Sequence, residues 1–167
     1  KLNFEDKIEF NKVSFNFTNQ NKKILDQISF KIKKNEKIGI LGETGSGKST
    51  LLNLIMGFLH PKNGNIFIDN SNLKNNFLTW QKLIGYVPQS IYILDDTLKK
   101  NITFQSDDKL IDFGLLEKSI ENSGLSNFLK KQTNRYETIL GERGSKISGG
   151  EILRIGLARA YYSKAEV

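Results

Sequence analysis

Eight consecutive residues have the types and spacing of a loop that binds phosphate groups. The run Gly42-Glu43-Thr44-Gly45-Ser46-Gly47-Lys48-Ser49 fits the pattern G-x-x-x-x-G-K-[ST] at every fixed position. Glycines carry no Cβ atom, so the backbone N–H groups of such a loop can point inward at phosphate oxygens. The lysine adds a positive charge for the β- and γ-phosphates, and the serine hydroxyl would ligate Mg²⁺. The pattern predicts binding of a nucleoside triphosphate with Mg²⁺.

The residues on either side of this loop predict the elements that must position it. Residues 37–41 form an apolar run that predicts a buried strand. Behind the loop, an amphipathic helix is predicted from apolar residues at i, i+3, i+4 and i+7, namely Leu51, Leu54, Ile55 and Phe58. The N-terminus of that helix, which carries about half a positive charge, would face the phosphates. The alternative is a Gly/Ser turn with an accidental lysine, and the strand-loop-helix context argues against it.

Apolar periodicity predicts the remaining elements. The segments with strand-like patterns are 8–10, 13–17, 28–32, 65–69 and 83–87. Residues 18–23 predict a turn, and the helix behind the phosphate loop is expected to end near Pro61. From residue 107 to residue 128 the pattern becomes helical, and residues 155–162 are helical again.

Composition limits the classes to which the chain can belong. A length of 167 residues with 38% hydrophobic content predicts one globular domain rather than a disordered chain. There is no cysteine, so neither a disulfide framework nor a cysteine-based metal site exists. The net charge is +7, but the lysines are spread along the chain, which favours a solvated basic surface over a nucleic-acid partner. Because the first residue is Lys1 rather than Met, we expect the chain to be a piece of a longer one.

A second motif lies about a hundred residues after the phosphate loop. Ser148-Gly149-Gly150-Glu151 has the form S-x-x-E of a capping box, which predicts the start of a helix whatever its function. Two glycines at a helix N-terminus also make a surface on which phosphate can dock. One chain cannot easily fold this surface onto its own phosphate loop. The pair of motifs therefore suggests a nucleotide shared between two copies.

With these two motifs, the sequence resembles the nucleotide-binding domain of ATP-binding cassette (ABC) transporters from about Ile8 to the last residue. The resemblance implies that the nucleotide is ATP and that residues 148–151 are the signature motif, which binds the γ-phosphate of the partner domain's ATP. The residues that it implies in binding this domain's own nucleotide are Phe17, Gly42, Glu43, Thr44, Gly45, Ser46, Gly47, Lys48, Ser49, Thr50 and Gln89.

Three of these assignments compete with structural explanations. The resemblance implies that Phe17 stacks on adenine, a contact worth roughly 1–3 kcal/mol, but the residue could equally belong to the core. It implies that Gln89 contacts Mg²⁺, with Ser49, and also the membrane domain; the alternative is an exposed turn residue. Glu142 falls in a segment, Gly-Glu-Arg-Gly, that resembles the exporter loop touching the transmembrane coupling helices, and it could be a polar turn.

The implied fold is an α/β P-loop NTPase of the ABC ATPase type, with an N-terminal antiparallel β-subdomain, a helical signature subdomain and its C-terminal part missing. The segments 1–35 and 62–75 are expected to form the β-subdomain, and 36–61 and 76–90 the P-loop core. Residues 91–160 would form the helical subdomain, and residues 161–167 the start of the Walker B strand.

The sequence departs from the family pattern at several positions. Asn35 replaces a usual glycine, which asparagine tolerates because it adopts positive φ more readily than most residues. Glu151 stands where glutamine is commonest and would bring negative charge toward a γ-phosphate unless the capping box holds it back. The Walker B aspartate, the catalytic glutamate and the switch histidine have no counterpart here, so no catalytic residue is assigned within these 167 residues. We expect the piece by itself to bind nucleotide poorly, to hydrolyse hardly any and to be poorly soluble.

The predicted function is that of an ATP-binding domain of an ABC exporter, which couples MgATP binding and hydrolysis in a domain dimer to transport across a membrane. Its expected partners are a second such domain and transmembrane domains upstream in the same polypeptide, at the cytoplasmic face of the inner or plasma membrane. Similarity through residues 84–104 is closest to exporters of lipids or lipid-linked sugars. The alternatives are a soluble ABC-type ATPase of DNA repair or translation and a non-catalytic nucleotide-binding remnant.

Overall fold

The computed structural model describes residues 2–18 and 22–167. Its contacts divide the chain into two compact units, Lys1–Lys82 and Leu83–Val167. Within the described ranges, none of the helices has the length and apolar character needed to cross a lipid bilayer. The six segments assigned to subdomains from the sequence stay predictions, and the two units are described separately below.

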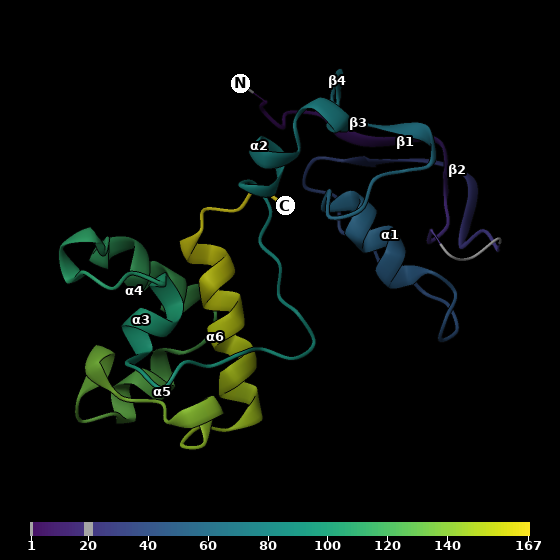
Figure 1. Ribbon diagram of the computed structural model, residues 1–167. Coiled ribbons are helices and arrows are strands. Elements are labelled where there is room, and N and C mark those ends of the chain that lie inside the picture. The colour runs from purple at the N-terminus through teal and green to yellow at the C-terminus, as the bar shows by residue number, and fades with distance from the viewer. Residues whose placement is uncertain (1, 19–21) are drawn as a thin grey trace. The chain divides into compact units, whose positions relative to one another are not determined.

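The first unit is built on a four-stranded antiparallel sheet in the order β2-β1-β3-β4 (Figure 1). Its strands are β1 (Lys7–Phe15), β2 (Leu25–Lys33), β3 (Asn63–Ile68) and the short β4 (Ser71–Asn72). Alternation along β1 buries Ile8 and Phe10, and the Phe10 ring stacks on that of its cross-strand partner Phe30 at 4.5 Å. The strands predicted at 8–10, 13–17, 28–32 and 65–69 are thus confirmed, except that β1 ends before Phe17.

A bulge in β1 explains why its pattern changes between Phe10 and Val13. Lys12 has φ 48°, and the register of both neighbouring strands shifts at this point. On β3, Gly64 faces the bulge, and a Cβ atom there would collide with the carbonyl oxygens of Asn11 and Lys12. Asn35, in the turn after β2, has φ 64°, as expected for an asparagine in place of glycine.

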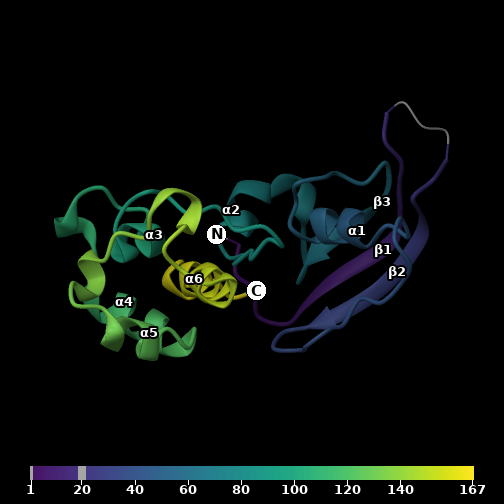
Figure 2. The same ribbon diagram turned by 90° about the horizontal axis from the view of Figure 1, so that it is seen from below.

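Two helices complete the first unit: α1 (Lys48–Ile55) and α2 (Phe77–Gln81), the latter preceded by the short 3₁₀ helix η1 (Leu73–Asn75). Figures 1 and 2 show α1 lying beside the sheet. The fully buried Trp80 of α2 donates its indole N–H to the Ile55 carbonyl at 2.7 Å and packs edge-to-face against Phe4 at 5.6 Å. This tryptophan therefore fixes the C-terminal end of α1, the helix that follows the phosphate loop.

The expected buried strand at residues 37–41 is not formed. This segment has no regular secondary structure, and Leu41 is 96% exposed while Ile38 is 50% exposed. A strand is stable only where a neighbour completes its backbone hydrogen bonds, and among the described residues no segment pairs with 37–41. The helix prediction is also shortened, because α1 ends at Ile55 and leaves Phe58 exposed.

Residues 83–87 do not form the expected strand either, although they begin to pair. The Gly85 N–H donates to the Val167 carbonyl at 2.8 Å, and the Glu166 N–H donates to the Leu83 carbonyl at 2.8 Å. These hydrogen bonds do not establish a strand, and Tyr86 is left 54% exposed. No strand forms within residues 161–167, because α6 (Gly149–Tyr162) continues to Tyr162 and the last residues have no regular secondary structure. Their assignment to the start of the Walker B strand stays a prediction.

The second unit consists of helices around α6 (Gly149–Tyr162). Helices α3 (Leu98–Thr103) and α4 (Phe113–Asn122) pack against α6. The remaining elements are α5 (Ser126–Lys131) and the 3₁₀ helices η2 (Asp108–Leu110), η3 (Arg135–Glu137) and η4 (Glu142–Gly144). Their shared core contains apolar residues of α3, α4, α5 and α6, including Leu98, Ile102, Leu116, Leu129 and Ile155. The helical pattern predicted from 107 to 128 is confirmed, divided among three short helices.

Side-chain caps define where these helices begin. The Thr97 hydroxyl accepts from the Lys100 N–H at the start of α3, and the Asp112 carboxylate accepts from the Leu115 N–H at 3.0 Å at the start of α4. The Thr97 backbone N–H donates to the carboxylate of the preceding residue, Asp96, at 2.7 Å. This hydrogen bond lowers the pKa of Asp96.

A buried lysine links α3 to the 3₁₀ helices η2 and η3 of the second unit. The Lys99 side chain is 5% exposed, and its Nζ lies 2.6 Å from an Asp108 carboxylate oxygen and 2.5 Å from a Glu137 oxygen. Hydrogen bonding to Asp108 and then to Glu137 raises the pKa of Lys99 against the opposing effect of burial. Both carboxylates are more than half exposed, so only the cation depends on its partners for solvation.

This asymmetry predicts an order of stabilities. Replacing both acids, Asp108→Asn with Glu137→Gln, leaves the ammonium buried and unpaired, which should cost about 3 kcal/mol in the free energy of unfolding. Lys99→Met leaves two carboxylates that water can solvate and should cost only about 1 kcal/mol. Denaturant unfolding of the complete domain, compared among the three proteins, measures both values. A larger loss for Lys99→Met would show that the cation is not the dependent partner.

Candidate functional site: a phosphate loop and a glycine-rich helix start

The phosphate loop closes onto the first turn of α1 through a glycine that no other residue could replace. Gly47 is the N-cap residue of α1, with φ 94° and ψ 6°, in the left-handed region. A Cβ atom at Gly47 would lie 3.0 Å from the Ile24 side chain and 3.2 Å from that of Leu25. The loop therefore needs glycine here for its backbone angle and also for its close contact with the start of β2.

The Lys48 side chain turns back over the loop. Its Nζ donates to the Gly42 carbonyl at 2.7 Å and to the Glu43 carbonyl at 2.6 Å, and it lies 3.5 Å from the Ser46 hydroxyl. The ammonium group thus occupies the mouth of the loop and neutralises the partial negative charge of its carbonyls. A phosphate group that takes the place of these carbonyls would offer the lysine a stronger, fully charged partner.

An open cavity with a volume of about 740 Å³ lies beside the loop, and this volume is large enough for a nucleotide. Loop residues 44–50 line one side, and Lys22, Lys23 and Ile24 line the other. Lys23 is held by Asp26 at 2.8 Å. No sequence motif marks these three residues, because they line the cavity only when the start of β2 lies next to the phosphate loop. Two additional cations at its wall suit a polyanionic ligand such as a triphosphate.

Ser49 fits the role of a Mg²⁺ ligand. It is exposed, directly follows Lys48 and lies at this cavity. Within the part of the chain that the structure describes, no group of three or more His, Cys, Asp or Glu side chains is placed to hold a metal. Mg²⁺ commonly takes only one or two protein oxygens and fills its remaining positions with phosphate oxygens and water. A single hydroxyl beside a phosphate loop therefore matches the way in which this ion is bound with nucleotides.

The second motif forms the predicted capping box at the start of α6. The Glu151 carboxylate accepts from the Ser148 N–H at 2.7 Å and from the Ser148 hydroxyl at 2.9 Å, while the Ser148 hydroxyl oxygen accepts from the Glu151 N–H. The Glu151 charge is thus held on the N-cap residue, as expected from the sequence. It also engages two donors of Ser148 that an incoming phosphate would otherwise use.

The two glycines between Ser148 and Glu151 present a bare backbone to solvent. Both are exposed, and a Cβ atom added to Gly149 or Gly150 would meet nothing within 4 Å. The protein's own packing therefore does not explain why glycine stands at these positions. An exposed helix N-terminus without side chains in the way leaves room for an anionic ligand to approach.

The other predicted site residues are exposed and keep their assignments as predictions. Phe17 is 45% exposed and packs edge-to-face on Phe15 at 5.1 Å, so it is not a core residue of β1. Gln89 is exposed in a bend, and Glu142 is exposed at the start of η4. The structure brings the loop residues together in the first unit, whereas Gln89, Glu142 and the capping box belong to the second.

Comparison with known proteins identifies the family of this pair of motifs. The family model described as "ABC transporter" matches residues 25–167. The chain is 38% identical over 162 residues to an export ATP-binding/permease protein of Rickettsia typhi, and 35% identical over 182 residues to ABC transporter B family member 6 of Dictyostelium discoideum. These alignments cover 96% of this chain but only 28% and 26% of the relatives, so the chain spans about a quarter of their length.

A solved structure agrees with this relationship. A bacterial Atm1-family ABC exporter with ATP bound superimposes with a TM-score of 0.84 at 28% identity, over 96% of this chain and 28% of the exporter chain. The match confirms the expected α/β fold of the ABC ATPase type, including its antiparallel sheet and helical part. The phosphate loop at Lys48 and the helix start at Ser148 thus lie in a chain that belongs to the ABC transporter family.

Proposed function

We propose that this chain is the ATP-binding domain of a membrane exporter and that it works as a dimer in which each ATP is bound by the phosphate loop of one copy and the Ser148 helix start of the other. The observation that carries the proposal is the exposure of Gly149 and Gly150 at the N-terminus of α6. An exposed helix N-terminus with no side chain in the way can bind an anionic ligand that another copy carries. The similarity to export ATP-binding/permease proteins supports the exporter class.

In this proposal the Lys48 ammonium exchanges its contacts with loop carbonyls for contacts with ATP phosphates. ATP phosphates displace the Lys48 ammonium from the Gly42 and Glu43 carbonyls, and the loop's N–H groups then surround the β-phosphate. The Ser49 hydroxyl would hold Mg²⁺, which when bound would supply positive charge to the phosphate groups. Phe17 stacks on the adenine ring, and Lys22 and Lys23 add positive charge along the cavity wall.

The remaining assignments connect ATP to the membrane. Gln89 contacts Mg²⁺ and a transmembrane domain of the same protein, and Glu142 contacts the transmembrane coupling segments. The domain would lie at the cytoplasmic face of the membrane, beside a second copy or a related domain. The 167 residues by themselves would hydrolyse hardly any ATP, because the residues that the family uses to orient the attacking water have no counterpart among them.

Hydrolysis by the full-length protein tests the proposal. Reconstituted in lipid vesicles, it should release phosphate from ATP only when Mg²⁺ is present, and excess chelator should abolish the reaction. A full-length protein that binds ATP without hydrolysing it would instead support a non-catalytic nucleotide-binding module.

The charge of Glu151 predicts that this domain turns over more slowly than its relatives with glutamine. Glu151→Gln keeps an oxygen that can accept from the Ser148 N–H, so the cap and the stability of α6 should be retained. It removes a negative charge beside the expected γ-phosphate, and we expect MgATP turnover of the full-length protein to rise by roughly 2- to 10-fold. Glu151→Ala, which removes both the charge and the cap, is the control. Turnover that falls in Glu151→Gln would show that the carboxylate assists the reaction.

A further inference from the structure

The segment around Gln89 rests directly on the backbone of α6. Gly156 lies in the middle of that helix, and a Cβ atom placed there would collide with the Ile91 side chain and come within 3.2 Å of the Val87 side chain. These two residues flank Gln89 in the sequence, at two positions before and after it. Gln89 is therefore exposed, while the side chains of Val87 and Ile91 on either side of it pack against the signature helix α6.

A fully buried asparagine holds the chain that follows. Asn101, on α3, is 0% exposed, and its side-chain oxygen accepts from the Leu94 N–H at 2.8 Å. Its side-chain nitrogen lies within hydrogen-bond distance of the carbonyls of Leu94 (3.0 Å), Asp96 (3.2 Å) and Thr97 (3.0 Å). One amide group thus satisfies the backbone of a segment that has no regular secondary structure of its own.

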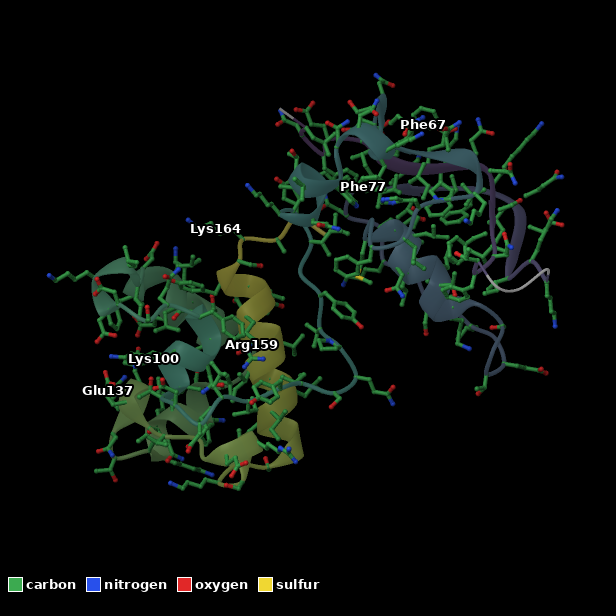
Figure 3. All side chains as sticks on the ribbon, viewed as in Figure 1. Phe67, Phe77, Lys100, Glu137, Arg159 and Lys164 are labelled. Carbon is green, nitrogen blue, oxygen red and sulfur yellow. The ribbon has the colours of Figure 1, made fainter. Side chains whose placement is uncertain are left out.

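Arg159 of α6 joins this arrangement one helical turn after Gly156. Its guanidinium donates to the Tyr92 carbonyl at 2.8 Å, to the Asn101 carbonyl at 2.6 Å and to the Asn101 side-chain oxygen at 3.2 Å. Figure 3 shows the Arg159 side chain leaving α6 toward α3. The same guanidinium lies over the Phe104 ring at 4.7 Å. Residues 91–97, α3 and α6 are thereby joined by Arg159 and Asn101. The contacts between Arg159 and Asn101 are partly buried, and the contact with the Tyr92 carbonyl is exposed.

We propose that Asn101 and Arg159 are positioning residues that make the Gln89 segment and the signature helix α6 move as one body. This inference rests on the function proposed above, in which Gln89 and Ser148 serve different ATP molecules. Neither residue lies in the unit that contains the phosphate loop. Their role is to transmit displacement of Gln89 to the N-terminus of α6 and not to bind the nucleotide.

The test measures turnover and ATP affinity separately in the full-length protein. Asn101→Asp keeps the size and the acceptor oxygen of the side chain but loses the N–H donors to three carbonyls. Arg159→Gln is compatible with helix α6 but loses the guanidinium and its hydrogen bonds to Tyr92 and Asn101. We expect kcat to fall roughly ten-fold in each, because misplacement of a catalytic element by about an ångström is costly. The ATP KM should stay within about two-fold of wild type. Arg159→Lys, which can reach one carbonyl, should recover part of the lost kcat.

Lys99→Met is the matched control. It removes a buried polar group from the same helix, two residues before Asn101, but its partners Asp108 and Glu137 lie outside the Gln89 segment. With turnover normalised to bound ATP, it should keep the wild-type kcat. The proposal is overturned if Asn101→Asp and Arg159→Gln also keep the wild-type kcat, or if kcat falls equally in all three variants.

Hydrogen exchange gives a readout that does not depend on hydrolysis. In nucleotide-free wild type, the Leu94 amide should exchange slowly, and it should exchange faster in Asn101→Asp. With the non-hydrolysable analogue AMP-PNP, protection of residues 91–97 and of the start of α6 should change together in wild type but not in Arg159→Gln. Joint changes that persist in Arg159→Gln would overturn the proposal. If wild type binds AMP-PNP but hydrolyses no ATP, the proposed function fails while this comparison still tests the connection.

Discussion

Lys48→Ala in the full-length protein should reduce MgATP hydrolysis by roughly 10²–10³-fold, the usual effect of removing one donor aimed at developing negative charge. The Lys48 ammonium is the only positive charge in the phosphate-loop motif, and it is placed for the β- and γ-phosphates. It is also already placed at the mouth of the loop, where it contacts the Gly42 and Glu43 carbonyls. Phosphate release at saturating ATP is the measurement.

Two controls separate a loss of chemistry from a loss of structure. Lys48→Arg keeps the positive charge but replaces the compact ammonium with a planar guanidinium. ATP hydrolysis should therefore remain strongly impaired while the protein folds normally. Lys34→Ala changes a lysine of the same unit whose amine contacts the Phe4 carbonyl, away from the phosphate loop, and should keep wild-type turnover. Hydrolysis at the wild-type rate in Lys48→Ala would mean that the loop is not the ATP site.

Gly150→Asp should abolish most ATP turnover while leaving the fold and the binding of ATP to the phosphate loop unchanged. A side chain at this position meets nothing within 4 Å, so the substitution does not disturb the packing of α6. It does place a negative charge where the partner's γ-phosphate is expected. At a separation of about 4 Å the repulsion amounts to about 1–4 kcal/mol, or roughly a 5- to 900-fold weakening of the closed dimer.

The isosteric variant Gly150→Asn isolates that charge. It adds the same bulk without the carboxylate, so it should retain clearly more turnover than Gly150→Asp at equal thermal stability. ATP-dependent dimerisation, followed by cross-linking between copies, should fail in Gly150→Asp and persist in Gly150→Asn. Equal turnover in the two variants would show that no phosphate approaches this helix start.

Several features of the site could be predicted from the sequence because they depend on neighbouring residues. The phosphate loop is recognisable in eight residues, since backbone freedom, lysine charge and serine hydroxyl all lie within one turn of chain. The capping box at Ser148 and Glu151 was predicted with its hydrogen bonds for the same reason. The positive φ of Asn35 likewise follows from the preferences of a single residue.

The prediction failed where an element needs a distant partner. Residues 37–41 have an apolar pattern, yet a strand forms only when another strand completes its hydrogen bonds, and none of the described residues does so. The same reason explains why pairing at residues 83–87 is limited to contacts with Glu166 and Val167. Exposed Leu41 and Tyr86 are the consequence, and they fit the expectation of poor solubility for these 167 residues in isolation.

The sequence by itself thus determined the ligand class, the two motifs and the helix start at Ser148, because each is encoded within a few consecutive residues. Only the tertiary structure placed Lys22 and Lys23 at the cavity beside the phosphate loop and joined Arg159 to Asn101, 58 residues away. Such contacts cannot be inferred from local pattern, since a buried polar group shows its partner only when the chain has folded around it.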